Sequence, residues 1–143
     1  MMLADEVAIR LRTLAVIDRV EDALQLQSLV ENGQLPAAGV SAFVVPIGLR
    51  GGQVRSATSP FVQDTEETLA VVLALRALTA LDTRAKASLP GLITQVIGVI
   101  AGWQPEGQPD AFRLGRAFLI SIQKGVLLYQ IEFSTSASLR IIT

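Results

Sequence analysis

The stretch from Phe61 to Leu81 constrains the fold more than any other part of the sequence, because an acidic head, Asp64–Glu67, runs directly into the longest apolar tract, Leu69–Leu81. With a period of two residues, the tract has one strongly apolar face and one face of small and mixed residues. As a helix, the same stretch offers Asp64 as an N-cap and Glu67 as its capping-box partner. The tract lacks the polar face of a surface helix. A long strand in the middle of the core is therefore favoured, with a helix as the alternative.

Local patterns also predict the other elements. Pro46 cannot donate a ladder hydrogen bond, so it predicts an edge position or a bulge in its strand. Pro90 fits the first turn of a helix better than its interior, so the helical region after Asp82 is predicted as one broken helix or two short segments. Periodicity predicts, in chain order, a helix over Leu3–Leu14, a weak strand over Val16–Asp22, a short helix over Leu24–Val30, a strand over Val40–Leu49, the central strand, a helix from Leu89 to Gly102, and a hairpin of two strands that turns at Lys124-Gly125.

This order of elements predicts an α+β fold, with a mainly antiparallel sheet of about four strands and helices packed on one face. The 143 residues fit a single domain over residues 1–143, and a chain of this length buries about two-thirds of its unfolded surface. No internal repeat interrupts the pattern.

The sequence contains no cysteine and no histidine. This excludes thiolate and imidazole metal sites, cysteine nucleophiles and histidine-based triads. Clustered carboxylates at Asp64, Glu66 and Glu67 could bind Mg²⁺, but on a strand Glu67 points away from the other two, which favours a solvated acidic strand end. The Gly48–Gly52 segment lacks the lysine of a phosphate-binding loop. We predict no catalytic residue, no cofactor and no metal site.

The composition indicates a protein that buries apolar surface in an assembly. Apolar residues make up 50% of the sequence, charged residues make up 17%, and the mean hydropathy of +0.48 is high for a soluble monomer. The apolar tracts are too short or too interrupted to span a membrane. Asp5 and Glu6 precede any hydrophobic run, so we expect no signal peptide. The net charge of −1 provides no global field to hold nucleic acid.

Five segments carry a further pattern: the N-terminal helix, the strand Phe43–Gly48 followed by Arg50-Gly51-Gly52, the acidic Gln63–Thr68 leading into Val71-Val72-Leu73, the helix exit Gly102–Pro105, and the final strand Leu128–Phe133. In this order they resemble the small tail terminator, or tail completion, proteins of tailed bacteriophages and prophages. The resemblance covers nearly the whole chain. It implies an α+β subunit that closes into a ring, typically a hexamer, which caps the tail tube and joins it to the neck. The family has no catalytic residues to carry over.

The resemblance also implies the partners. They are further copies of the chain, the tail tube protein and a neck or head-completion protein, with DNA passing through the lumen without specific binding and with no membrane contact. The implied location is the virion tail at the tail–neck junction, after synthesis in the cytoplasm of the bacterial host. A head-closure or neck adaptor protein is the alternative within virion proteins. A small α/β ligand-binding domain or enzyme is the alternative outside that class.

We place the assembly interface in the segment Arg50–Pro60 and at the acidic strand end. The segment reads as a long loop, because its glycines make it flexible, its arginines give it charge, and Val54 is its one apolar anchor. Such a segment cannot fold alone, so we expect it to be disordered in the free subunit and ordered by a neighbour. The predicted interface residues are Arg50, Gly51, Gly52, Gln53, Val54, Arg55, Asp64 and Glu66.

Overall fold

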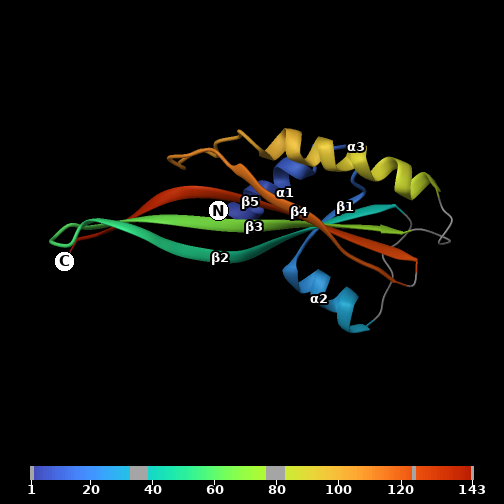
Figure 1. The fold of residues 1–143 in the computed structure, drawn as a ribbon, viewed down its shortest axis with the longest axis horizontal. Coiled ribbons are helices and arrows are strands. Elements are labelled where there is room, and N and C mark those ends of the chain that lie inside the picture. The colour runs from blue at the N-terminus through green and yellow to red at the C-terminus, as the bar shows by residue number, and fades with distance from the viewer. Residues whose placement is uncertain (1, 33–38, 77–82, 124, 143) are drawn as a thin grey trace.

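The computed structural model describes residues 2–32, 39–76, 83–123 and 125–142, with the backbone alone at residues 32, 83–88 and 123. Within these ranges the chain alternates helices with the strands of one sheet (Figure 1). The elements are α1 (Leu3–Leu11), β1 (Arg19–Asp22), α2 (Ala23–Asn32), β2 (Val40–Ser56), β3 (Phe61–Arg76), α3 (Thr83–Ile100), β4 (Arg113–Gln123) and β5 (Val126–Ile141).

The central tract is a strand, as predicted, and β3 lies in the middle of the sheet. The end of the tract, residues 77–81, lies outside the described residues. The strand order is β1-β2-β3-β5-β4, in which β1 and β2 are parallel and every other neighbouring pair is antiparallel. The α+β fold with a mainly antiparallel sheet is therefore confirmed. The sheet has five strands rather than about four, because the short β1 adds to the edge of β2.

Helices cover both faces of the sheet rather than one (Figure 1). On the face that we call the α1–α3 face, Leu11 and Ile100 are buried with alternate residues of β3 in the main core. On the opposite face, which we call the α2 face, Leu26 of α2 packs near Val72 and Ala74 of β3. The side chains of β3 on the α2 face are small but apolar in the segment Leu69–Leu75, so α2 has an apolar surface on which to pack.

α3 runs without a break and has Pro90 in its interior. The predictions of a broken helix and of Pro90 in a first turn are therefore wrong. The apolar face of the helix, with Leu92 and Val96 buried in the core, holds the helix together where the proline removes a backbone hydrogen bond. The helix ends before Gly102, whose φ of 81° is the left-handed conformation of a helix C-terminus. No helix in the described part of the chain, α3 included, is long and apolar enough to cross a membrane.

The region predicted as a long loop, Arg50–Pro60, is mostly strand. β2 continues to Ser56 and β3 begins at Phe61, so the interpretation as a disordered loop is wrong. The glycines are accommodated by shifts in the register of β2 against β3. At Gly52, a Cβ atom would lie 3.3 Å from the backbone carbonyl oxygen of Asp64, so the close approach of the two strands favours glycine. The predicted bulge at Pro46 is confirmed by a register shift between Pro46 and Gly48.

The predicted C-terminal hairpin is formed by β4 and β5, and Gly125 at its turn has a φ of 77°. β5 extends beyond the predicted strand and pairs with β3 from Val126 to Ile141 without a register shift. The register shifts of the sheet fall in the two ladders on either side of the β3–β5 pair, between β2 and β3 and between β4 and β5. The sheet therefore has a regular central pair with an irregular ladder on each side.

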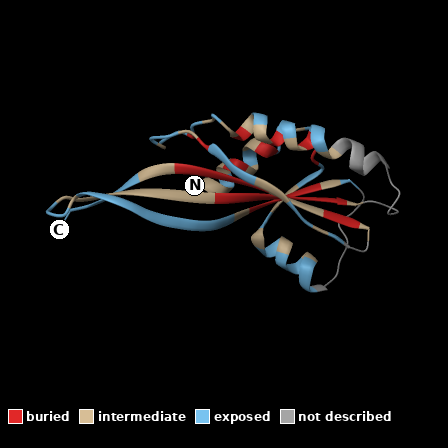
Figure 2. Cartoon of the chain, viewed as in Figure 1, coloured by how far each residue is buried: buried red, intermediate tan, exposed pale blue. Residues whose placement is uncertain are grey.

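The three longest strands extend beyond the helices as an arm, which we define as residues 46–68 and 136–141 (Figures 1 and 2). We call the rest of the described chain the body. In the body, every residue of β3 from Leu69 to Leu75 is buried, whereas no residue of β3 from Phe61 to Thr68 is buried. The far end of the arm joins the β2–β3 turn to the end of β5, because Phe61 pairs with Ile141.

Candidate docking surface on the arm

The two faces of the arm differ in chemistry. Residues directly opposite one another on paired strands share a face, and faces alternate along each strand. On the face that continues the α1–α3 face, Leu49 is 71% exposed and Val54 is 44% exposed. On the face that continues the α2 face, Arg50 lies opposite Glu66, which lies opposite Ser136. The arm therefore carries exposed apolar side chains among polar ones on the first face, and charged and polar side chains on the second.

The arm and the loop that precedes β4 surround an open hollow of ≈ 540 Å³. All the predicted interface residues except Val54 line this hollow. Val54 belongs to the first face instead. The residues that line the hollow are Arg50, Gly51, Gly52, Gln53, Arg55, Asp64, Thr65, Glu66, Pro109, Asp110, Ser136, Ala137 and Ser138.

Arg55 and Asp64 form an ion pair at the hollow. The Nη2 atom of Arg55 lies 2.8 Å from Oδ2 of Asp64, and Nε of Arg55 donates a hydrogen bond to the same oxygen at 2.9 Å. The hydrogen bond that Arg55 donates to Asp64, and then the negative charge of Asp64, raise the pKa of the Arg55 guanidinium. Since both side chains are solvent-accessible, the pair contributes little to stability. Its effect is to fix one positive and one negative charge across β2 and β3.

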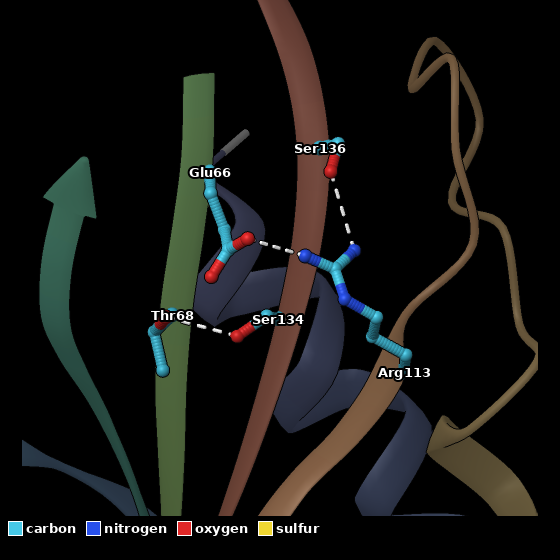
Figure 3. A network of polar contacts seen from close by, with 5 residues as sticks. All are labelled: Glu66, Thr68, Arg113, Ser134 and Ser136. Atoms are coloured by element: carbon cyan, nitrogen blue, oxygen red, sulfur yellow. Dashed lines mark hydrogen bonds and ion pairs between the residues drawn. The ribbon is translucent and has the colours of Figure 1, made fainter. Parts of the chain in front are cut away.

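A second polar network joins β3, β5 and β4 (Figure 3). Arg113 donates a hydrogen bond from Nη2 to Oε2 of Glu66 at 2.5 Å and another from Nη1 to Oγ of Ser136 at 3.2 Å. The hydroxyl oxygens of Thr68 and Ser134 are 2.9 Å apart. Figure 3 shows Arg113 reaching across β5 from the start of β4 toward Glu66. The network therefore links the outer strand β4 to the central strand at the base of the arm.

Of the two basic residues that line the hollow, Arg55 is paired with Asp64, whereas Arg50 has no ion-pair partner among the described residues. It lies opposite Glu66 in the register, but the Glu66 carboxylate is already bound to Arg113. Arg50 is exposed, and it has no hydrogen-bond or ion-pair partner in the described part of the chain. A guanidinium in this position can form a charge-assisted hydrogen bond with an anionic group of a partner.

The acidic cluster does not gather its carboxylates at one point. Asp64 and Glu66 each contact an arginine. Glu67 lies on the opposite face, where it pairs in register with Thr135. Among the described residues, no group of three or more histidine, cysteine or acidic side chains is placed to hold a metal ion. The acidic strand end thus contributes to the ion pairs of the arm.

Sequence reasoning missed the residues of the hollow that come from the second half of the chain. Asp110 lies in the loop that precedes β4, and Ser136 and Ser138 lie in the part of β5 that was not predicted as a strand. Arg113, at the start of β4, binds Glu66 without lining the hollow itself. Alternation within a strand does not tell which strands are neighbours. The signal that could have found part of this set is the run Ser134–Ser138, whose small polar residues suit an exposed strand.

The fold defines a class of protein, namely an α+β chain whose three longest strands extend beyond the helices as an arm. The search of curated proteins finds no match. Among solved structures, a chain in a structure described as the virion of a native gene transfer agent particle has the same fold, with 16% sequence identity and a TM-score of 0.50 over 99% of this chain and 95% of that chain.

The sequence model of the phage tail terminator protein family matches residues 2–143. The chain therefore belongs to the phage tail terminator family, which confirms the resemblance drawn from the sequence. It is a structural protein of the phage tail.

Proposed function

We propose that copies of this chain close into a hexameric ring that caps the tail tube at the tail–neck junction and presents a docking surface to the neck or head-completion protein. The observation that carries this proposal is the family match over residues 2–143. The apolar content of 50% and the exposed apolar residues of the arm support the burial of further surface in an assembly. In this role the chain acts as one domain, through shape and binding rather than through catalysis.

We propose further that the hollow of the arm is the docking surface, with Arg50 as its anchor. Within the hollow, Arg55 and Asp64 already neutralise one another, and the Glu66 carboxylate is bound to Arg113 of β4. Arg50 is left to bind a carboxylate of the neck or tube protein, and such a bond across an interface weakens as salt increases. DNA passes through the lumen in this proposal without a specific contact.

The variant Arg50→Glu tests the docking surface. We expect it to fold normally and to change the free energy of unfolding by less than about 0.5 kcal/mol, because Arg50 is exposed and unpaired among the described residues. We expect it to lose the joining of tails to heads in a complementation assay. Arg19→Glu is the matched control, because Arg19 is exposed on β1, away from the hollow, and this variant should join tails normally.

The ring itself is tested by native mass spectrometry and electron microscopy of the unaltered protein, alone and with tail tubes. A ring on the end of the tube supports the proposal. A protein that stays monomeric in both conditions contradicts the ring. If the Arg50→Glu variant joins tails to heads normally, the proposed docking surface is contradicted, but the proposed ring is not.

A further inference from the structure

We infer that the ring closes by strand pairing between copies, in which β4 of one copy lies beside the free edge of β2 in the arm of the next copy. The inference rests on the proposed ring and names the contact that closes it. β1 pairs with β2 only from Ser41 to Val44. From Val45 to Ser56, no described strand lies beside the outer edge of β2. The backbone groups of such an edge can pair with a strand of another chain.

β4 supplies a strand for this position. It is the last strand at the other side of the sheet, and its length of 11 residues is close to that of the free part of β2. Natural edge strands usually carry charges or proline that prevent pairing, but Ala117–Ile122 has neither. In this segment Leu119, Ile120 and Ile122 are 48%, 44% and 57% exposed. The edge of β4 is therefore apolar and open.

The directions of the strands agree with this contact. β2, β3, β5 and β4 follow one another across the sheet, and each is antiparallel to the next. β4 is therefore antiparallel to β2. In a ring all copies keep the same orientation to the axis, so β4 of one copy meets β2 of the next in the antiparallel sense, with like faces on the same side.

The exposed apolar side chains of the two edges lie on the same face. Leu114, Leu119 and Ile122 of β4 lie opposite residues of β5 on the α1–α3 face. Leu49 and Val54 of β2 lie on the continuation of that face in the arm. Pairing the two edges therefore places apolar side chains beside apolar side chains and removes them from water.

Two of the three register shifts of β2 also have a counterpart in β4, whereas the third, between Val54 and Ser56, has none. Pro46–Val54 lies opposite Leu69–Gln63 of β3, and Leu114–Ile122 lies opposite Phe133–Leu127 of β5. The two stretches are equally long and contain equally many extra residues against their inner neighbours. With Leu49 opposite Leu119, the shift between Gly51 and Val54 falls opposite the shift between Leu114 and Ala117, and the shift between Pro46 and Gly48 falls one residue from the shift between Leu119 and Ser121. A bulge bends its strand, so strands with bulges at matching or adjacent positions can run side by side. The register that aligns them pairs Leu49 with Leu119, Val54 with Leu114, and Pro46 with Ile122.

This register also predicts how the strands lie in the ring. Within one copy, Leu119 is level with Leu73 of β3, whereas Leu49 is level with Glu67. Pairing Leu49 with Leu119 therefore shifts each copy along the strands by about six residues, or roughly 20 Å at about 3.3 Å per residue. A closed ring accommodates such a shift when its strands are inclined to the axis, as they are in a β-barrel.

Disulfide cross-linking tests the contact, because the chain has no cysteine of its own. The test variant carries Leu49→Cys and Leu119→Cys in the full chain. Within one copy these positions are separated by β3 and β5, which is about 14 Å at about 4.8 Å per strand, beyond the reach of a disulfide. Every disulfide must therefore join two copies. We expect oxidation to give a ladder of covalent oligomers that ends at the subunit number of the ring.

The matched control carries Leu49→Cys and Ser121→Cys, because Ser121 lies opposite Leu128 on the α2 face. We expect at least tenfold less cross-linking in this variant. Efficient dimers from Leu119→Cys alone would show that β4 pairs with β4 and would overturn the inference. A ring seen by native mass spectrometry without cross-links between positions 49 and 119 would overturn the contact but keep the proposed function. Monomers alone and with tail tubes would overturn both.

Discussion

The body half and the arm half of β3 belong to one strand with one continuous ladder to β5, yet different forces hold them. In the body half, Leu69–Leu75 are at most 3% exposed and helices cover both faces. In the arm half, Phe61–Thr68 pair with the same two neighbouring strands, but none of them is buried. Hydrogen-bonded pairing thus extends the strand beyond the core, while apolar burial supplies most of the stability. The side chains of β3 in the arm stay accessible to solvent.

The largest difference between the halves is expected for leucine to alanine substitutions. Leu73 is 0% exposed at the centre of the body, so Leu73→Ala should lower the free energy of unfolding by about 2–5 kcal/mol. Leu49, which is 71% exposed on the arm, provides the matched control, and in the dissociated subunit Leu49→Ala should cost less than about 0.5 kcal/mol. Urea unfolding of the two variants measures both values. Equal losses would contradict the division into body and arm.

A smaller effect is expected at the boundary between the halves. The hydroxyl of Thr68 bonds to that of Ser134, which is only 7% exposed. Thr68→Ala leaves the Ser134 hydroxyl without this partner, and we expect a loss of about 1 kcal/mol in the free energy of unfolding. Ser138→Ala, at an exposed position of the arm, is the control and should have almost no effect. If both variants were as stable as the parent protein, packing of the body would end before Thr68.

The smallest of these effects is expected for the ion pair between Arg113 and Glu66. The two side chains are 47% and 43% exposed, so Arg113→Gln should cost about 0.2–1 kcal/mol at low salt. The cost should fall at high salt because exposed charges are screened. Thermal or urea unfolding at two salt concentrations measures this difference. A large loss that does not depend on salt would mean that Arg113 stabilises the arm through packing.

The sequence predicted the elements that local patterns define. The alternation in β3, the hairpin of β4 and β5 and the helix end at Gly102 are each visible in a short stretch, and the structure confirms them. The extension of β2 through Gly51 and Gly52 could not be predicted in this way, because the segment has no apolar alternation and is a strand only through its pairing with β3. The glycines and arginines of this segment therefore led to the prediction of a loop.

The candidate site was predicted in part, and on a wrong structural premise. Arg50 and Arg55 were chosen as parts of a flexible loop, but they lie on a strand that lines the hollow. The link from Glu66 to Arg113 could not be predicted, because it depends on β4 lying beside β5 and on the length of Arg113 across that strand. That these residues form an interface stays a prediction.

The unbroken ladder between β3 and β5 has a mechanical consequence. It pairs residues from Arg76 to Phe61 without a register shift, over roughly 50 Å at about 3.3 Å per residue. Bulges are the points where strands bend, and in this sheet they lie only in the ladders on either side of the β3–β5 pair. We therefore expect the arm to act as a stiff lever without a hinge. A force applied to the tip of the arm by a neighbouring ring would then rotate the arm together with α1 and α3. Contact at one end of the chain would therefore move the helices at the other end.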